Sequence, residues 1–182
     1  MLKAIAVAAV VLIVAVAAVL LLAARKPTTF RIARTARINA PPGRVFALID
    51  DFRAWSAWSP WERMDPALKR TYDGAPRGNG AVYAWEGNRK VGQGRMEIVD
   101  ASAPSRITIR LDFLKPFRAR NTAEFTLVSQ GDATEVTWAM TGPNLFIGKV
   151  MGLFVDMDRM IGRDFERGLA NLKAAAEAGE RP

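Results

Sequence analysis

The chain has 182 residues and a net charge of +8, half of its residues are hydrophobic, and it contains neither histidine nor cysteine. Without those two residue types it can form no disulfide, no imidazole-based catalytic triad and no zinc or haem site of the usual His or Cys kind. We therefore expect no cofactor and no metal, and any catalysis would depend on carboxylates, tyrosine, lysine or arginine.

The first predicted element is an apolar N-terminal helix. Residues Ala4–Ala24 form an unbroken run of 21 Ala, Val, Leu and Ile residues. A helix of this length measures about 31 Å and matches a bilayer hydrocarbon core of about 30 Å. We predict a transmembrane helix over 4–24 that anchors the protein in a membrane. The alternative is a cleaved signal peptide, although the apolar part of such a peptide is usually only about 7–15 residues long.

Basic residues follow this segment more often than they precede it. Only Lys3 precedes the apolar run, and the residues after it are Arg25, Lys26, Arg31, Arg34 and Arg37. The positive-inside rule then favours a single-pass protein with a cytoplasmic C-terminal domain. The same five residues are expected to lie beside anionic lipid head groups. The other basic residues are dispersed among acidic ones, so we expect no nucleic-acid partner.

Short elements follow the anchor. Residues 28–38 alternate loosely and are rich in β-branched side chains, which predicts a first strand. Residues 41–52 begin with two prolines and have apolar residues at helical spacing, which predicts a short amphipathic helix. In residues 53–64, tryptophan recurs at every third position, a spacing typical of a short helix or a 3₁₀ turn.

Alternating strand patterns and a long helix make up the rest of the chain. The predicted strands cover residues 81–87, 91–100, 106–113, 121–128 and 134–140, and their short connections indicate an antiparallel meander. Residues 143–178 predict one helix-like segment, with a possible break near Gly148 or Gly152. This order predicts an α+β domain in which the last helix packs against a curved sheet.

Four segments resemble a known family. The sequence PPGRVFALIDDFRAWSAWSPWERMDP resembles the N-terminal signature of the START-like helix-grip superfamily, also called SRPBCC, and in particular its polyketide cyclase/dehydrase family. GAVYAWEGNRKVGQGRMEIV, LDFLKPFRARNTAEFTL and VTWAMTGPN resemble later strands of the same family. The resemblance implies that residues 27–182 form a helix-grip domain, in which about seven antiparallel strands curve around a long C-terminal helix.

The resemblance also implies a cavity between sheet and helix, which in many relatives takes an apolar small molecule or a lipid. The preferred interpretation is a membrane-anchored binding domain for such a ligand. A polyketide cyclase or dehydratase-like enzyme, with Tyr83 or a carboxylate as the acid, is an alternative. A stress or partner-binding module without a ligand is another. The iron-binding oxygenase branch of the superfamily needs histidine ligands, so the sequence excludes it.

Successive side chains of a strand point to opposite faces of the sheet, so the sequence predicts which residues line the cavity. The expected ligand-binding residues are mostly aromatic or sulfur-containing: Trp58, Trp61, Tyr83, Trp85, Asn121, Trp138, Met140, Met151 and Phe154. For Trp58, Trp61 and Met151, ordinary core packing is the favoured alternative. No catalytic residue is assigned, because Glu62, Asp112 and Glu124 fall where surface charges are expected.

Trp138 separates the cavity interpretation from the core interpretation. Replacement of a buried Trp by Ala in a packed core costs roughly 3–5 kcal/mol of stability. We predict that Trp138 borders existing space, so that its truncation costs less than about 2.5 kcal/mol and alters the binding of a hydrophobic dye.

Overall fold

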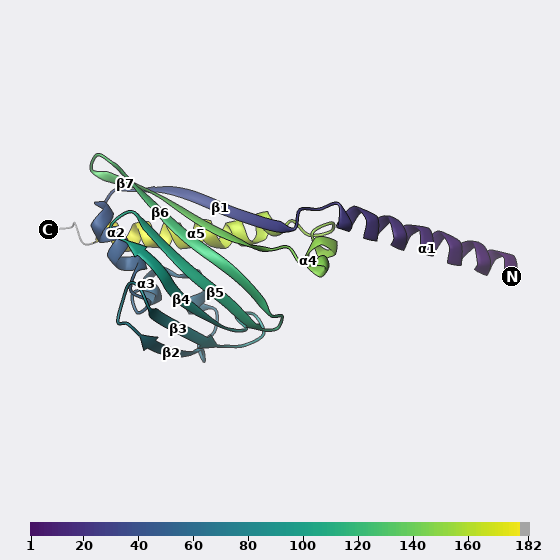
Figure 1. Ribbon diagram of the computed structural model, residues 1–182, viewed down its shortest axis with the longest axis horizontal. Helices are drawn as coiled ribbons and strands as arrows, with labels where there is room; N and C mark the ends of the chain where they lie inside the picture. Colours follow the sequence, from purple (N-terminus) through teal and green to yellow (C-terminus); the bar gives the residue numbers. More distant parts are fainter. Residues whose placement is uncertain (179–182) are drawn as a thin grey trace.

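The computed structural model describes residues 1–178, apart from the side chain of Leu2. It shows an α+β domain from which one long helix extends (Figure 1). The last four residues of the expected domain, 179–182, lie outside the described residues.

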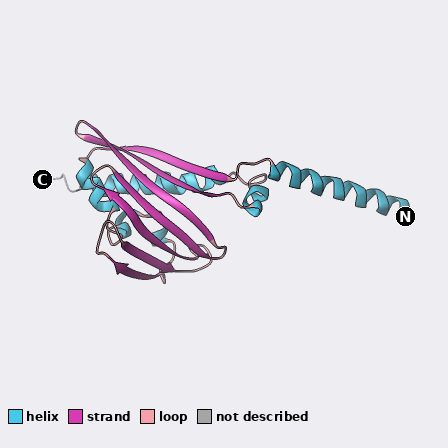
Figure 2. Ribbon diagram, in the orientation of Figure 1, coloured by secondary structure: helices cyan, strands magenta, loops and turns pink. Residues whose placement is uncertain are grey.

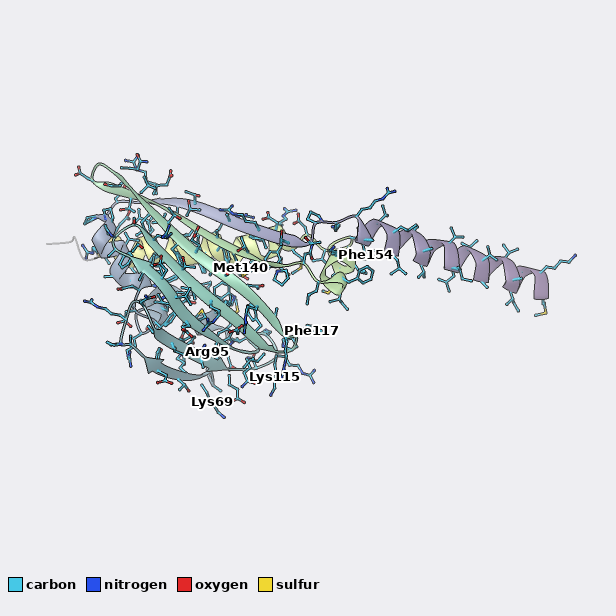
Figure 3. All side chains as sticks on the ribbon, viewed as in Figure 1. Lys69, Arg95, Lys115, Phe117, Met140 and Phe154 are labelled. Atoms are coloured by element: carbon cyan, nitrogen blue, oxygen red, sulfur yellow. The ribbon has the colours of Figure 1, made fainter. Side chains whose placement is uncertain are left out.

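The extending helix is α1, Leu2–Ala24. It projects away from the rest of the molecule, and most of its apolar side chains are exposed (Figures 1 and 3). Within it, Lys3–Ala24 is long and apolar enough to cross a membrane. A helix that is hydrophobic all round and has no core to pack against is typical of a membrane span.

The domain is built on one antiparallel sheet of seven strands. In sheet order they are β1 (Thr29–Ile38), β7 (Ala133–Pro143), β6 (Ala119–Gln130), β5 (Arg106–Lys115), β4 (Gln93–Ser102), β3 (Ala81–Glu86) and β2 (Lys69–Gly74). Neighbouring strands follow one another in sequence except at β1, which pairs with β7 along its whole length. The sheet curves around a long C-terminal helix (Figure 2). The predicted helix-grip fold is therefore confirmed.

Strand β2 is the element that the sequence patterns did not indicate. Its six residues are almost all exposed, and it lies at the edge of the sheet beside β3. An edge strand with both faces largely wet has no alternation of apolar and polar residues, so periodicity cannot reveal it.

Two short helices and a 3₁₀ turn cover one end of the concave face. They are α2 (Pro42–Ile49), α3 (Trp55–Trp58) and the turn Pro60–Arg63, as the tryptophan spacing predicts. The indole N–H groups of Trp55 and Trp58 donate to the carbonyl oxygens of Ile49 and Leu48, at 2.9 and 2.8 Å. These bonds satisfy carbonyl groups at the C-terminal end of α2, which has no further helical turn to use them.

The C-terminal segment differs from the single long helix that was expected. Strand β7 continues to Pro143, a short helix α4 covers Phe146–Met151, and the long helix α5 covers Met157–Glu177. Helix α5 begins afresh because the Asp156 carboxylate caps it, accepting from the Arg159 backbone N–H at 2.9 Å.

Helix α5 is fastened to the edge strand β1. The Arg34 guanidinium binds Asp158 at 3.0 Å and Glu166 at 2.8 Å. It lies against Gly162, where a Cβ atom would overlap it. The bond to Arg34 lowers the pKa of Asp158. The Arg34 guanidinium is thus paired with carboxylates of the same domain.

The same strand geometry corrects the expected cluster of basic residues at the membrane. Arg34 serves the contact between β1 and α5, and Arg37 lies near the far end of β1, about 25 Å from its start at about 3.3 Å per residue. Neither is placed to contact lipid head groups beside α1, so the prediction was wrong for these two residues.

Candidate functional site

A cavity of about 240 Å³ lies between the concave face of the sheet and helix α5. Its walls are mainly apolar and come from the α3 and 3₁₀ region, from β3 to β7, and from α5. The lining residues are Trp55, Ser59, Trp61, Glu62, Leu68, Tyr83, Trp85, Lys90, Val91, Met96, Leu111, Phe113, Ala123, Trp138, Met140, Ile161, Asp164 and Phe165.

Five of the nine residues expected to bind ligand line this cavity: Trp61, Tyr83, Trp85, Trp138 and Met140. Trp58 and Asn121 are buried, at 1% and 6% exposure, but lie behind the lining. Trp58 is a core residue that packs edge-on against Phe125 and Trp138.

Met151 and Phe154 were assigned to the cavity wrongly. Their side chains are 47% and 74% exposed, and neither lines the cavity. The assignment assumed one continuous helix. Met151 instead ends α4 and Phe154 lies in the loop before α5, beside the end of α1 (Figure 3).

Trp138 is the centre of an aromatic cluster that joins the sheet to α5. Its ring is parallel to that of Phe165, with centroids 4.2 Å apart and an interplanar angle of 4°. Phe125 stacks at 4.9 Å, and Trp58 and Trp61 approach edge-on at 5.7 and 5.6 Å. Such pairs each contribute about 0.5–1.5 kcal/mol beyond the burial of area. Trp138 is therefore both a cavity wall and a packed core residue.

A second wall of the cavity depends on a glycine. Trp85 on β3 lies across Gly94 on β4, where a Cβ atom would overlap the indole ring. The Trp85 indole N–H donates to the Val91 carbonyl at 3.2 Å, which fixes the ring orientation. Gly94 thus makes room for a neighbouring side chain, one of the roles expected of a glycine inside a strand.

One end of the cavity is polar, and its centre is Glu62. The Glu62 carboxylate accepts from the Tyr83 hydroxyl at 2.6 Å and from Arg70 Nε at 2.6 Å. Arg70 also donates to the backbone carbonyls of Glu62 and Leu68. The side chain of Glu62 is only 6% exposed, so the expectation that Glu62 is a surface charge was wrong.

Sequence reasoning missed Glu62 because its partners are distant along the chain. The glutamate follows Trp61 in a 3₁₀ turn, and Tyr83 is 21 residues further on, in β3. Nothing in the PWER segment itself distinguishes a buried acid from an exposed one. Asp112 and Glu124 differ, because both lie outside the cavity lining and Asp112 forms an ion pair with Arg120.

The protonation of Tyr83 follows from its surroundings. Burial first, and then the hydrogen bond to Glu62, raise the pKa of the Tyr83 phenol well above its ordinary value. The hydroxyl is therefore protonated at neutral pH and acts as a hydrogen-bond donor. A phenol shifted in this direction is a poor proton donor in catalysis, since an effective acid has a pKa near the working pH.

Two buried polar atoms near the cavity have no hydrogen-bond partner among the described residues. They are the indole Nε1 of Trp138 and the amide Oδ1 of Asn121. A buried polar atom without a partner costs about 1–3 kcal/mol, and neither atom has a surface accessible from the cavity.

Comparison with known families identifies the domain. The family described as polyketide cyclase/dehydrase and lipid transport matches residues 29–177. The chain belongs to this family. Membership covers the sheet and all the helices after α1, which agrees with the resemblance seen in the sequence. No curated protein sequence matches the chain.

Solved structures of the same fold share little sequence with it. The di-domain ARO/CYC protein BexL from the BE-7585A biosynthetic pathway has a TM-score of 0.60 at 21% identity, over 88% of this chain and 53% of that one. A Chromobacterium violaceum protein has a TM-score of 0.57 at 16% identity, over 84% and 99%. The Aha1 dimer from Colwellia psychrerythraea has a TM-score of 0.56 at 15% identity, over 84% and 99%. These likenesses establish the fold of this polyketide cyclase/dehydrase family member.

The aromatic cluster revises the expected cost of truncating Trp138. We predict that Trp138→Ala lowers the free energy of unfolding by about 3–5 kcal/mol, because the stacked contacts with Phe165 and Phe125 are lost. Trp138→Phe keeps an aromatic ring on Phe165 and removes the unpartnered N–H together with the second ring of the indole, so it should cost less than half as much. Denaturant unfolding of a chain that begins at Pro27 measures both. A loss below about 2.5 kcal/mol for Trp138→Ala would show that packing there is loose.

The polar end of the cavity gives a second prediction. Tyr83→Phe and Glu62→Gln should each lower the free energy of unfolding by about 1–3 kcal/mol, since each removes part of a buried hydrogen-bonded group. Asp112→Asn and Glu124→Gln, outside the cavity, are the controls and should change it by less than about 0.5–1 kcal/mol. The double variant Tyr83→Phe/Glu62→Gln tests whether the two side chains interact. If its loss of unfolding free energy equals the sum of the two single losses, a direct Tyr83–Glu62 hydrogen bond is contradicted.

Proposed function

We propose that the protein is a membrane-anchored domain that binds an apolar small molecule or a single-chain lipid in the cavity under α5. The observation that carries the proposal is the cavity itself, which has aromatic and aliphatic walls and one polar end. Ligand sites in proteins commonly combine such walls with a few convergent polar groups. The family description, which includes lipid transport, supports the same class of ligand.

The size and polarity of the cavity narrow the ligand. Its volume of about 240 Å³ is below the range of about 300–1,000 Å³ usual for drug-sized ligands. A small ring system or part of one acyl chain fits better than a two-chain lipid. The Tyr83 hydroxyl already donates to Glu62, so we propose an amphipathic ligand whose polar group donates a hydrogen bond to the Glu62 carboxylate.

An enzymatic function of the polyketide cyclase or dehydratase type is the second candidate. The observation in its favour is a buried carboxylate next to a phenol at the cavity wall. Against it, the raised pKa of Tyr83 makes that residue a weak acid. We therefore place Glu62 and Tyr83 as groups that orient the ligand, with no assigned catalytic residue and no proposed cofactor.

A variant that fills the cavity tests the binding function. We predict that the full chain purified in mild detergent carries a small-molecule or lipid mass in native mass spectrometry. Ala123→Phe places a ring inside the cavity and should abolish this mass. The matched control is Thr122→Phe, which adds the same ring to the exposed face of the same strand and should keep it. Retention of the mass in folded Ala123→Phe would exclude this cavity as its site.

Membrane anchoring is a separate part of the proposal. It is supported by the length, apolar composition and exposure of α1, and the charge bias after it favours a cytoplasmic domain. We predict that the full chain remains in the membrane pellet after carbonate washing. A chain that begins at Pro27 should be released and folded. A soluble mature protein that begins near residue 24 would instead identify a cleaved signal peptide.

A further inference from the structure

Exposed apolar side chains outside α1 gather at one end of the domain. Phe154, Phe117 and Ile147 are 74%, 72% and 64% exposed. Phe154 and Ile147 belong to α4 and the loop after it, and Phe117 belongs to the β5–β6 turn. Among the described residues after α1, the only exposed large hydrophobic side chains away from this end are Val99 and Val128. A cluster of exposed apolar side chains of this kind is typical of a surface that contacts a membrane or another protein.

The apolar surface lies at the end from which α1 leaves. Only residues 25–28 separate α1 from β1, and α4 packs against the end of α1, where Ala23 is fully buried. The Lys26 ammonium donates to the Gly152 carbonyl just after α4. Figure 3 shows Phe154 beside the end of α1, with Phe117 on the neighbouring turn. If α1 spans a bilayer, α4 lies at its surface.

The charges around this surface suit lipid head groups. Residues 144–155 contain no Asp or Glu and one basic residue, Lys149. The acids that follow are both engaged within the domain, because Asp156 caps α5 and Asp158 pairs with Arg34. The β5–β6 turn adds Lys115 and Arg118 beside Phe117, again with no acid. Exposed aromatic and aliphatic side chains bordered by cations are typical of segments that lie in the interfacial layer of an anionic membrane.

The cavity reaches the same end of the domain. Lys90 and Val91, which line it, lie in the β3–β4 turn, and Phe113 lies near the end of β5. In an antiparallel meander, the β3–β4 and β5–β6 turns lie at the same end of the strands, and the start of β1 lies there too. Lys90 is exposed, so the cavity lining extends to the surface on this side.

We propose that α4, its following loop and the β5–β6 turn are embedded in the interfacial layer of the bilayer that α1 spans. The domain then lies against the membrane with its cavity mouth towards the lipid, and an amphipathic ligand passes between bilayer and cavity without crossing water. This inference rests on the proposed anchoring by α1 and adds the docked orientation of the domain.

The cysteine-free sequence allows a direct test with single spin labels on the full chain. The protein is reconstituted into vesicles of phosphatidylcholine with one-quarter phosphatidylglycerol. Labels are attached to Phe117→Cys, Ile147→Cys and Phe154→Cys, with Val11→Cys as the reference within α1 and Val128→Cys as the aqueous reference. All five positions are exposed, so cysteine and the label should be tolerated there. The measurement is the accessibility of each label to oxygen, which concentrates in lipid, and to a water-soluble nickel complex.

We expect the ratio of oxygen to nickel accessibility at 117, 147 and 154 to be severalfold higher than at 128. Values equal to that at 128, with position 11 in lipid, would overturn the docked orientation and leave the anchor intact. Positions 147 and 154 shielded from both reagents would indicate a protein partner, such as a second copy, and would also overturn it. An aqueous signal at position 11 would refute the anchor, and the docked orientation with it.

Discussion

The packing of Trp138 on Phe165 is the contact on which the architecture of this domain depends. One ring belongs to β7 and the other to α5, and they stack at 4.2 Å in the middle of the concave face. Gly168, one turn after Phe165, leaves room for the edge of the Trp138 ring, which a Cβ atom would overlap. The sheet and α5 can therefore approach closely at this point. Further towards Tyr83 and Trp85 the sheet curves away, and the space that remains is the cavity.

A buried carboxylate makes one part of this mainly apolar cavity polar. Glu62 is held from both sides, by Arg70 from the edge strand and by Tyr83 from the cavity wall. Taking such a charge out of water is costly unless its hydrogen bonds are satisfied, and here two donors satisfy it. In the proposed binding function, a ligand places its polar group at Glu62 and its apolar part against the tryptophans.

The position of the proposed anchor relates the cavity to a membrane. Helix α1, the short helix α4 and the turns that border the cavity all lie at one end of the domain (Figure 1). A ligand that is poorly soluble in water benefits from a binding site at the membrane, because the cost of exposing apolar surface to water is avoided. The docked orientation and the binding function are thus physically consistent, although each depends on a separate measurement.

Local sequence patterns determined much of this protein. The apolar run that became α1, the alternation that placed Tyr83, Trp85 and Trp138 on inner faces, and the family resemblance all depend on residues close together in the chain. What tertiary structure alone decided involves distant residues. Glu62 became a buried group in the cavity wall only because β2 and β3 bring Arg70 and Tyr83 to it. Phe154 became part of an exposed surface because Asp156 starts a new helix after it. Local periodicity predicts the face of a strand or helix on which a side chain lies. It does not predict which residue from a distant part of the chain contacts that side chain.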